Sequence, residues 1–170
     1  METLKVKRET ATREHCRQLA PFMKEADMRE VRLASGLSPL EALEVSLDLS
    51  EEADAFVLGK QVVALSGVAA LPRVSDPQEE SVGTATCGTT TCGIVWALTV
   101  PLSGWKKTFW NISQEVILEY QRRFLALTNY CDVDNTETIR YLKKLGFVFI
   151  RREEQFGVEK KPFYQFVRIG

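Results

Sequence analysis

The sequence predicts an α+β protein whose central sheet is mixed and mostly antiparallel, with helices flanking it. Two observations carry this prediction. Segments of strand character and segments of helical periodicity follow one another as strand, helices, antiparallel strands, long helix, strand, helix, strand and strand. The stretch from Asn135 to Ile150 also contains a helix cap, an apolar helical stripe, a glycine stop and a strand, which makes it the best-specified element of the chain.

The N-terminal third is predicted to form one strand over 3–8 and three short helices over 11–20, 27–34 and 38–47. The strand alternates apolar and charged residues, which is typical of a half-buried strand. Pro21 divides or ends the first helix, because proline lacks the N–H that a helix interior needs, and Gly36 stops the second helix. Ser38, Pro39 and Glu41 supply the N-cap, the first-turn proline and the capping-box carboxylate of the third helix.

The next segment is predicted to be a hairpin followed by a loop. Two β-rich runs, over 53–58 and 61–71, flank Gly59-Lys60, and such a pair favours a hairpin turn. Residues 72–91 are rich in Pro, Ser, Asp, Glu, Thr and Gly. We therefore expect an exposed loop there, within a single domain that spans 1–170.

The C-terminal half is predicted to contain two helices and four strands. A strand over 93–100 precedes a long helix over 104–125 with Ser103 as its N-cap, and a strand over 127–133 follows. Asn135 or Thr136 caps the last helix, and Gly146 stands where a C′ glycine belongs. The final strands cover 147–152 and 162–169 and run antiparallel across a charged loop over 153–161.

Composition narrows the class of protein. Lys and Arg total 22 and Asp and Glu total 23, so the chain lacks the overall positive field that drives binding to nucleic acids or anionic membranes. No apolar run reaches the roughly 20 residues that cross a bilayer, and the charged N-terminus does not resemble a signal peptide. We expect a cytosolic protein with free thiols.

The cysteine spacing gives no metal prediction. Cys87 and Cys92 form the only close cysteine pair, with no second Cys or His pair, and His15 is the only histidine. We interpret the pair as two thiols in a hairpin turn, with a metal site or a loop disulfide as the alternatives.

The order of elements and the C-terminal motif N-x-x-x-I-R-x-x-x-x-L-G-F resemble the GNAT family of acyl-CoA-dependent N-acyltransferases; the motif residues are Asn135, Ile139, Arg140, Leu145, Gly146 and Phe147. The resemblance implies a GNAT-like fold that binds acetyl-CoA where two central parallel strands splay apart, here those that end near Val100 and Val133. It also implies a glycine-rich loop, R/Q-x-x-G-x-G/A, whose backbone amides hold the pyrophosphate at the start of the long helix.

The chain departs from the GNAT pattern at this loop. The corresponding stretch from Val100 to Lys107 has one glycine, Gly104, where the family has two or more, and Trp105 adds bulk where the backbone must approach the phosphates. Lys106 and Lys107 supply positive charge in exchange. If CoA binds, the expected cofactor-binding residues are Val100, Gly104, Lys106, Lys107 and Asn135.

A second departure lies in the last helix. GNAT enzymes commonly place a tyrosine three residues before the final leucine of the motif, where it protonates the departing CoA thiolate, and that position is Leu142 here. Tyr141 is one residue away, which is a rotation of about 100° on a helix. We therefore interpret Tyr141 as a packing residue, with a catalytic role as the alternative. Asp132 and Asp134 lie just past a strand end, and we interpret them as caps of the next helix and its turn, with a general base as the alternative.

Several further motifs look like the GNAT-like proteins of short-tailed bacteriophages, a group that includes internal virion protein A and phage acyltransferases. The motifs are REVRLASGLSPLEALEVSL, GIVWAL, KKTFWN and LTNYCDVDNT, followed by the LGF motif. This similarity covers about 29–149.

Two functional hypotheses follow from these resemblances. The first is a non-catalytic GNAT-fold phage protein, without a cofactor, that contacts other virion proteins or a host protein during particle assembly or genome ejection. Its support is the altered loop together with Leu142. The second is an acyl-CoA-dependent acyltransferase, or a CoA-binding modulator, that acts on a host or phage substrate. Either would act in the host cytoplasm during infection, and the first also in the virion interior.

Overall fold

The structure is a computed structural model that describes residues 5–71 and 92–170. Its elements are β1 (Val6–Thr10), α1 (Arg13–Leu19), the 3₁₀ helix η1 (Ala20–Phe22), α2 (Glu25–Ser35), α3 (Pro39–Leu49), β2 (Glu52–Leu58), β3 (Gln61–Ala70), β4 (Cys92–Thr99), α4 (Lys106–Gln121), β5 (Ala126–Asp132), α5 (Thr136–Lys144), β6 (Val148–Phe156) and β7 (Lys161–Ile169). Within these two stretches no helix is long and apolar enough to cross a membrane.

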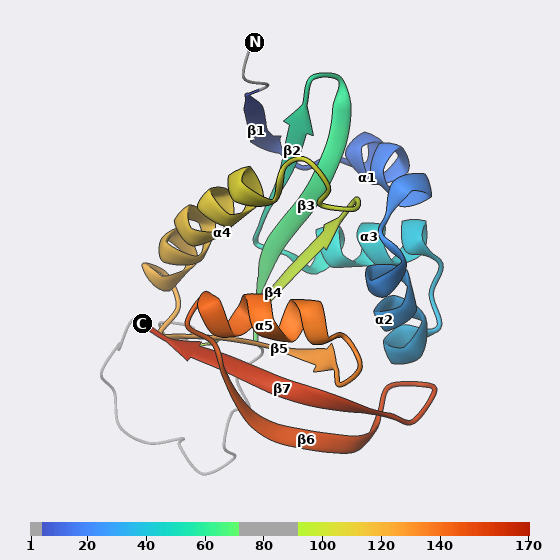
Figure 1. Cartoon of the computed structure of the whole chain (residues 1–170), viewed down its shortest axis with the longest axis vertical. Coiled ribbons are helices and arrows are strands. Elements are labelled where there is room, and N and C mark those ends of the chain that lie inside the picture. Colours follow the sequence, from blue (N-terminus) through green and yellow to red (C-terminus); the bar gives the residue numbers. More distant parts are fainter. Residues whose placement is uncertain (1–4, 72–91) are drawn as a thin grey trace, which may run out of the picture.

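The described strands form one seven-stranded sheet in the order β1-β2-β3-β4-β5-β7-β6, with helices on both faces (Figure 1). Every neighbouring pair is antiparallel except β4 and β5, which are parallel. The predicted α+β class with a mixed, mostly antiparallel sheet is therefore confirmed. The parallel pair is short, because it joins only Cys92–Ile94 to Ala126–Thr128.

The local signals of the N-terminal half are confirmed. Pro21 lies in η1 directly after α1, and Gly36 ends α2 with a left-handed φ of 71°. Ser38 and Glu41 form the predicted capping box at the start of α3. The hairpin turn at Gly59 is also present. The start of the first predicted strand, the loop over 72–91 and Cys87 lie outside the described residues.

Two predicted helix boundaries are wrong. The N-cap of α4 is Trp105 and not Ser103, because Gly104 turns the chain with a φ of 84° and the buried Trp105 indole then donates to the carbonyl of Pro101 at 3.2 Å. The same helix ends at Gln121 and not near 125. The side-chain amide of Gln121 donates to the carbonyl of Phe124 at 2.9 Å. This side chain closes the turn after the helix, so the helix does not continue.

The predicted charged loop over 153–161 is also wrong in part, because β6 continues to Phe156. Arg151 pairs with Glu153, and Arg152 donates to Glu154 at 2.6 Å, so charges of opposite sign alternate along each side of the strand. Only 157–160 form the turn that leads into β7. An edge strand tolerates such charged residues, because one of its edges faces solvent.

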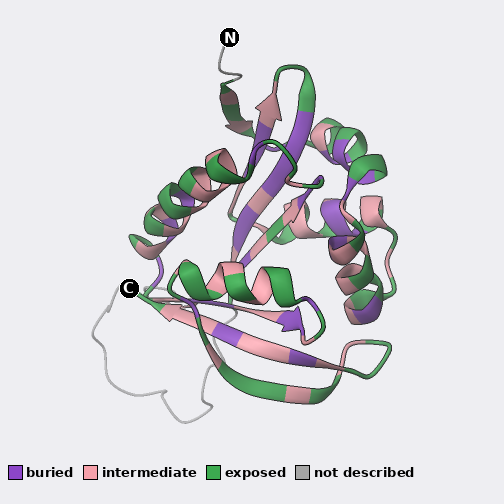
Figure 2. Ribbon diagram, in the orientation of Figure 1, coloured by how far each residue is buried: buried purple, intermediate pink, exposed green. Residues whose placement is uncertain are grey.

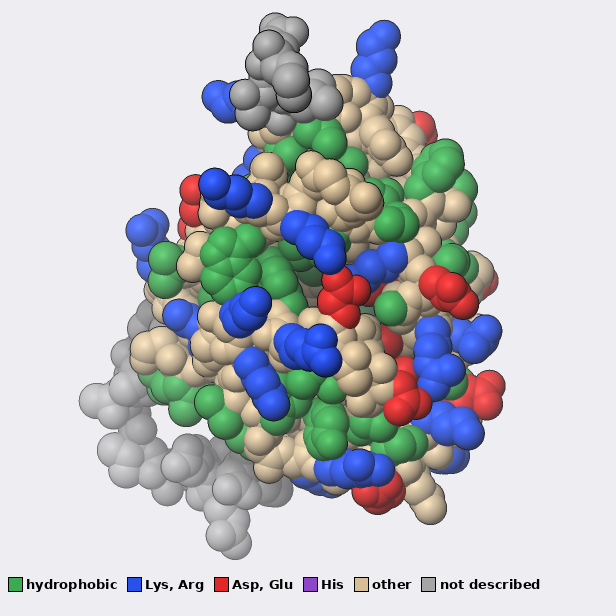
Figure 3. Space-filling view, in the orientation of Figure 1, with side chains coloured by type: hydrophobic (Ala, Val, Ile, Leu, Met, Phe, Trp, Pro, Cys, Tyr) green, Lys and Arg blue, Asp and Glu red, His purple; other side chains and the backbone are tan. Residues whose placement is uncertain are grey.

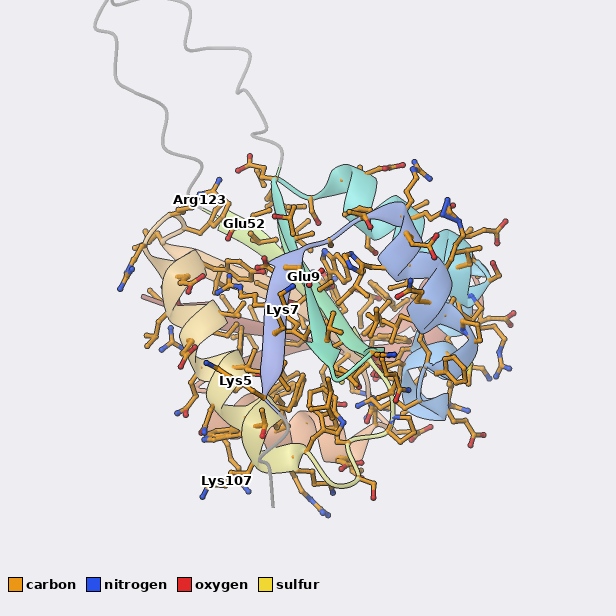
Figure 4. The ribbon with its side chains drawn as sticks, turned by 90° about the horizontal axis from the view of Figure 1, so that it is seen from above. Lys5, Lys7, Glu9, Glu52, Lys107 and Arg123 are labelled. Carbon is orange, nitrogen blue, oxygen red and sulfur yellow. The ribbon has the colours of Figure 1, made fainter. Side chains whose placement is uncertain are left out.

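One face of the sheet is covered by α4. Arg8 of β1 donates to Asp54 of β2 at 2.7 Å and to Glu119 of α4 at 2.6 and 2.8 Å. Just after the C-terminal end of α4, Arg123 donates to Glu52 at 2.8 Å, and Figure 4 shows these two side chains close together beyond the end of β1. These ion pairs hold the long helix against the N-terminal strands.

The opposite face is covered by α1 and α3. Gly67 of β3 lies under this layer, where a Cβ would stand 2.7 Å from the indole nitrogen of Trp96 and 2.8 Å from the hydroxyl of Ser50. Leu19 of α1 and Leu43 of α3 are fully buried there. Figure 2 shows the buried residues concentrated in the central strands and on the inner sides of the helices, so the core lies on both faces of the sheet.

The turn between β6 and β7 contacts the C-terminal end of α2. The N–H groups of Val158 and Glu159 donate to the carbonyls of Ala34 and Leu33 at 3.1 and 3.2 Å. The last carbonyls of a helix have no partner within the helix, so this turn satisfies them. Gly157 allows the approach, because a Cβ there would lie 2.6 Å from the Ala34 Cα.

We predict that Gly157→Ala destabilises the protein by more than Gly59→Ala. Both glycines have a left-handed φ, of 69° and 64°, but no atom of another described residue lies within 4 Å of the Cβ position of Gly59. The φ effect alone costs about 1–2 kcal/mol at either site. Urea unfolding of the two variants measures the difference, and equal losses of stability would contradict the close contact between the turn and α2.

Candidate functional site

A cavity of about 410 Å³ opens where β4 and β5 stop pairing. Its walls come from both faces of the sheet: α2 and α3 on one side, and α4 and α5 on the other. Most of the lining side chains are apolar, with a few polar groups between them. A cavity of this size and composition is typical of a small-molecule site.

The side chain of Asn129 spans the gap between the two strands. Its Nδ2 donates to the carbonyl of Val95 in β4 at 2.7 Å, and its Oδ1 accepts from the N–H of Tyr130 at 2.8 Å. The amide thus satisfies a carbonyl that has lost its sheet partner, since a buried backbone group needs one. Sequence reasoning missed Asn129, because a single polar residue in a strand does not reveal which carbonyl it faces.

Glu30 of α2 is the most distinctive group in the cavity wall. Its Oε1 accepts from the Cys131 thiol at 3.3 Å, the Asp132 N–H at 3.1 Å and the Asn135 amide at 2.8 Å. Its Oε2 accepts no hydrogen bond from the described part of the chain. Burial raises the pKa of Glu30 to about 7, although the three hydrogen bonds act in the opposite direction. A carboxyl with this pKa can take up or release a proton near neutral pH.

Asp27 lies one helical turn before Glu30 and faces the same cavity. It is only 7% exposed and accepts from the N–H of Thr99 at 2.9 Å, with the ammonium of Lys24 3.5 Å away. Burial raises the pKa of Asp27 to about 6. Two carboxyls with raised pKa values in one cavity mark a candidate site for binding or deprotonating a cation. Neither residue stood out in the sequence, where both belong to an ordinary amphipathic helix.

Asp132 and Asp134, the two predicted base candidates, are held by Arg29. The guanidinium donates to Asp132 at 2.9 Å and to Asp134 at 3.3 Å. Asp132 also accepts from the N–H of Asp134 at 3.1 Å, so it orders the turn before α5. Neither carboxylate is part of the cavity wall.

Asn135 has two roles in the structure. Its Oδ1 caps α5 by accepting from the N–H of Thr138 at 3.2 Å, as the sequence predicts. Its Nδ2 donates to Glu30 at 2.8 Å, a contact that joins α5 to α2. The residue expected to touch a cofactor is therefore placed beside the carboxyl of Glu30.

Tyr141 and Leu142 both line the cavity, from the α5 side. The Tyr141 ring stacks on Phe109 with centroids 5.3 Å apart, and its hydroxyl donates to Ser113 at 2.5 Å. Burial raises the pKa of Tyr141 to about 12, so its hydroxyl stays protonated at neutral pH. Tyr141 thus packs between α4 and α5 and at the same time keeps a proton near the cavity.

A second hollow, of about 630 Å³, lies between the start of α4 and α5. Its lining includes one carboxylate, Glu137, and five cations: Lys24, Lys106, Lys107, Arg140 and Lys144. Figure 3 shows Lys and Arg side chains gathered over α5 on this face. The sequence predicts Lys106 and Lys107 as cofactor-binding residues. It did not reveal that α5 would place Arg140 and Lys144 beside them.

The first turn of α4 adds unpaired backbone donors to this hollow. Among the residues that the structure describes, no side chain caps the helix, so its first N–H groups lack the acceptor that a cap would provide. Gly104 lies two residues before the helix and has open space around its Cβ position. The N–H of Val100, in contrast, already donates to the carbonyl of Val63 at 3.0 Å. Lys106 contacts Glu137 at 3.3 Å, and both side chains are exposed. The hollow is therefore suited to an anion with several phosphate oxygens.

No protein-family model and no curated protein sequence matches this chain. Solved structures do match. An N-acetyltransferase from Staphylococcus aureus Mu50 has a TM-score of 0.68 at 10% identity, over 97% of this chain and 98% of its own. A ribosomal-protein-alanine N-acetyltransferase from Brucella melitensis has a TM-score of 0.68 at 14% identity, over 96% and 99%.

The protein yncA from Salmonella typhimurium, described as an acetyltransferase and solved with its cofactor acetyl-CoA, has a TM-score of 0.64 at 12% identity, over 96% of this chain and 93% of its own. These likenesses establish that the chain has the GNAT fold, as its C-terminal motif predicts. Because these sequence identities are low, the shared fold does not establish the reaction, which must be argued from the residues of the site.

We predict that Asp27→Asn raises stability at pH 8. The folded-state pKa of Asp27 is about 6 against 3.8 for the unfolded chain, so the folded state holds its proton more tightly and stability falls as pH rises from about 4 to about 6. The loss amounts to about 3 kcal/mol, and this figure already includes the favourable interaction of Asp27 with Lys24. Asparagine avoids it and still accepts from Thr99.

Urea unfolding at pH 4, 6 and 8 measures this effect. The matched control is Asp132→Asn, which should lose stability at pH 8 because Arg29 then lacks its buried partner. A D27N variant that is less stable than the wild type at pH 8 would contradict the cost assigned to the buried charge.

Proposed function

We propose that the protein is an acyl-CoA-dependent N-acyltransferase in which Glu30 is the general base. The observation that carries this proposal is that Glu30 lines the cavity at the gap between β4 and β5 and that the pKa of its carboxyl is raised to about 7. Its Oε2 accepts no hydrogen bond from the residues that the structure describes. A general base works best when its pKa lies near the operating pH. The established GNAT fold makes an amine the expected acceptor.

The residues of the two hollows fit acyl-CoA. Lys106, Lys107, Arg140 and Lys144 would hold its phosphates, together with the N–H groups at the start of α4. These cations take the place of the missing glycines, because side-chain ammonium and guanidinium groups bind phosphate oxygens as backbone amides do. The apolar cavity would receive the rest of the cofactor. Acyl-CoA supplies an acyl group that is activated as a thioester.

The chain's own groups divide the proton chemistry between the two sides of the sheet. Oε2 of Glu30 accepts a proton from the acceptor amine, while three donors fix Oε1 and so hold the carboxylate in place. Asp27 lies beside it and stabilises the positive charge of the incoming ammonium. On the other side, Leu142 has no proton to give to the departing CoA thiolate. The protonated hydroxyl of Tyr141 is the donor on α5, and it would have to release its hydrogen bond to Ser113 first.

A second candidate is a non-catalytic virion protein of a short-tailed bacteriophage that contacts other virion proteins or a host protein. Its support is the single glycine before α4, the ion pair of Lys106 with Glu137, and Leu142 at the position of the family's tyrosine. A protein with this role would be found in purified particles by mass spectrometry. It would also not need to bind CoA.

We predict that CoA binds and that Lys106→Ala/Lys107→Ala weakens binding at least about tenfold, or about 1.4 kcal/mol, because two phosphate partners are lost. Isothermal titration calorimetry with CoA measures this. The control is Lys60→Ala/Lys161→Ala, which removes two exposed lysines that do not line the hollow and should leave binding unchanged. If the protein does not bind CoA at millimolar concentration, the acyltransferase proposal is contradicted and the non-catalytic virion protein is the candidate that stands.

We predict that Glu30→Gln lowers kcat/KM for acetyl transfer to a primary amine by about 10²–10⁴, because the base is lost. CoA binding should not change. The wild-type rate should rise with pH through an apparent pKa near 7, and the variant should lose this rise. Glu25→Gln, an exposed residue of the same helix, is the control. Full activity of E30Q with an unchanged pH profile would assign the base to another group.

A further inference from the structure

The α2 side of the cavity has an aromatic wall. Tyr130 of β5 and Phe156 of β6 stack with ring centroids 4.4 Å apart and planes at 22°, and Trp96 of β4 lies on the same side of the gap. Val31 and Leu37 extend this apolar surface. The wall faces the helix that carries Asp27 and Glu30, so ring surfaces and two carboxyls share one compartment.

The polar groups of this compartment are mostly used within the protein. The Trp96 indole donates to Ser50 at 2.8 Å, the Asn129 amide donates to Val95 at 2.7 Å, and the Ser35 hydroxyl donates to Val31 at 2.8 Å. A ligand rich in hydroxyl groups would leave its own polar groups unpaired here, which is unfavourable. An apolar ligand body avoids this penalty.

The charges of the compartment are also few. Asp27 and Glu30 are the two carboxyls of the cavity wall in the described residues, and Lys24 stands 3.5 Å from Asp27. When both carboxyls are ionised, the positive charge of Lys24 offsets one of their two negative charges. A single ammonium group on the ligand then balances the other. A ligand with several ammonium groups would bring surplus positive charge into an apolar site, next to Lys24.

We infer that the acceptor substrate is a small monoamine with an aromatic body, whose ring packs against Tyr130 and Phe156 and whose nitrogen lies at Glu30. The inference rests on the proposed function and specifies the substrate class of the same site. Ring stacking on this pair adds contact beyond simple burial. Polyamines, amino sugars and peptide N-termini are the alternatives that the wall and its charge disfavour.

Calorimetric titration of the full chain with 2-phenylethylamine, spermidine and a short peptide with a free N-terminus tests the inference. We expect 2-phenylethylamine to bind at least about tenfold more tightly than the other two. Rates of acetyl transfer from acetyl-CoA to the three amines should follow the same order. Tighter binding or faster modification of spermidine or of the peptide would overturn the inference.

Phe156→Leu tests the wall itself, because leucine keeps apolar volume and removes the ring. We expect it to weaken 2-phenylethylamine binding by about threefold to tenfold, with CoA binding unchanged. Phe149→Leu is the matched control: Phe149 is another half-buried phenylalanine of β6 that contacts Tyr164 and Phe166, but it does not itself line the cavity. If both variants bind the amine equally well, the ring of Phe156 does not contact it and the inference fails.

The two proposals fail in different ways. If the protein transfers acetyl groups mainly to spermidine or to the peptide and depends on Glu30 for this, the acyltransferase proposal stands and the inference of an aromatic acceptor is overturned. Phe156-dependent binding of 2-phenylethylamine without transfer and without CoA binding would keep the amine site and overturn the acyltransferase.

Discussion

The early separation of β4 and β5 is the feature on which the candidate site depends. The two strands pair over only three residues each, yet each is held by seven residue pairs to its antiparallel neighbour, β4 to β3 and β5 to β7. They can therefore part without losing their place in the sheet. Parting leaves the carbonyl of Val95 without a strand partner, and the amide of Asn129 satisfies it. The gap in the sheet is thus a stable part of the fold.

This gap connects two compartments of opposite charge. On the α2 side lie Asp27 and Glu30, and on the side of α4 and α5 lie the four cations Lys106, Lys107, Arg140 and Lys144. A cation and an anion are thereby directed to opposite faces of one sheet, with an apolar passage between them. That arrangement suits the proposed transfer between a phosphorylated donor and an amine acceptor.

Contacts between distant segments hold the acidic side in place. Asn135 joins the start of α5 to Glu30, and the turn at Gly157 joins the C-terminal hairpin to the end of α2. The same hairpin brings Phe156 against Tyr130. The carboxyl of Glu30 and the aromatic wall are therefore positioned by the C-terminal third of the chain, although Glu30 itself comes from near the N-terminus.

Local interactions explain which features were predictable from the sequence. The capping box of Ser38 and Glu41, the cap at Asn135 and the left-handed glycines each involve atoms within a few residues, so their patterns are visible in a single sequence. The boundaries at Ser103 and after Phe156 were missed because Trp105 and Phe156 are held by contacts of the folded chain. Hence the α+β class and the C-terminal motif were predictable, and some element ends were not.

The site itself was decided by tertiary structure. Lys106 and Lys107 were visible as neighbours in sequence, but Arg140 and Lys144 joined them only when α5 packed beside α4. Asp132 was a reasonable base candidate until Arg29, a hundred and three residues earlier, paired with it. Glu30 had no distinguishing neighbour in sequence, and its raised pKa comes from burial at the gap between β4 and β5, which begin about 60 and about 100 residues further along the chain. Burial and charge pairing depend on which distant residues meet, and that is settled only when the chain has folded.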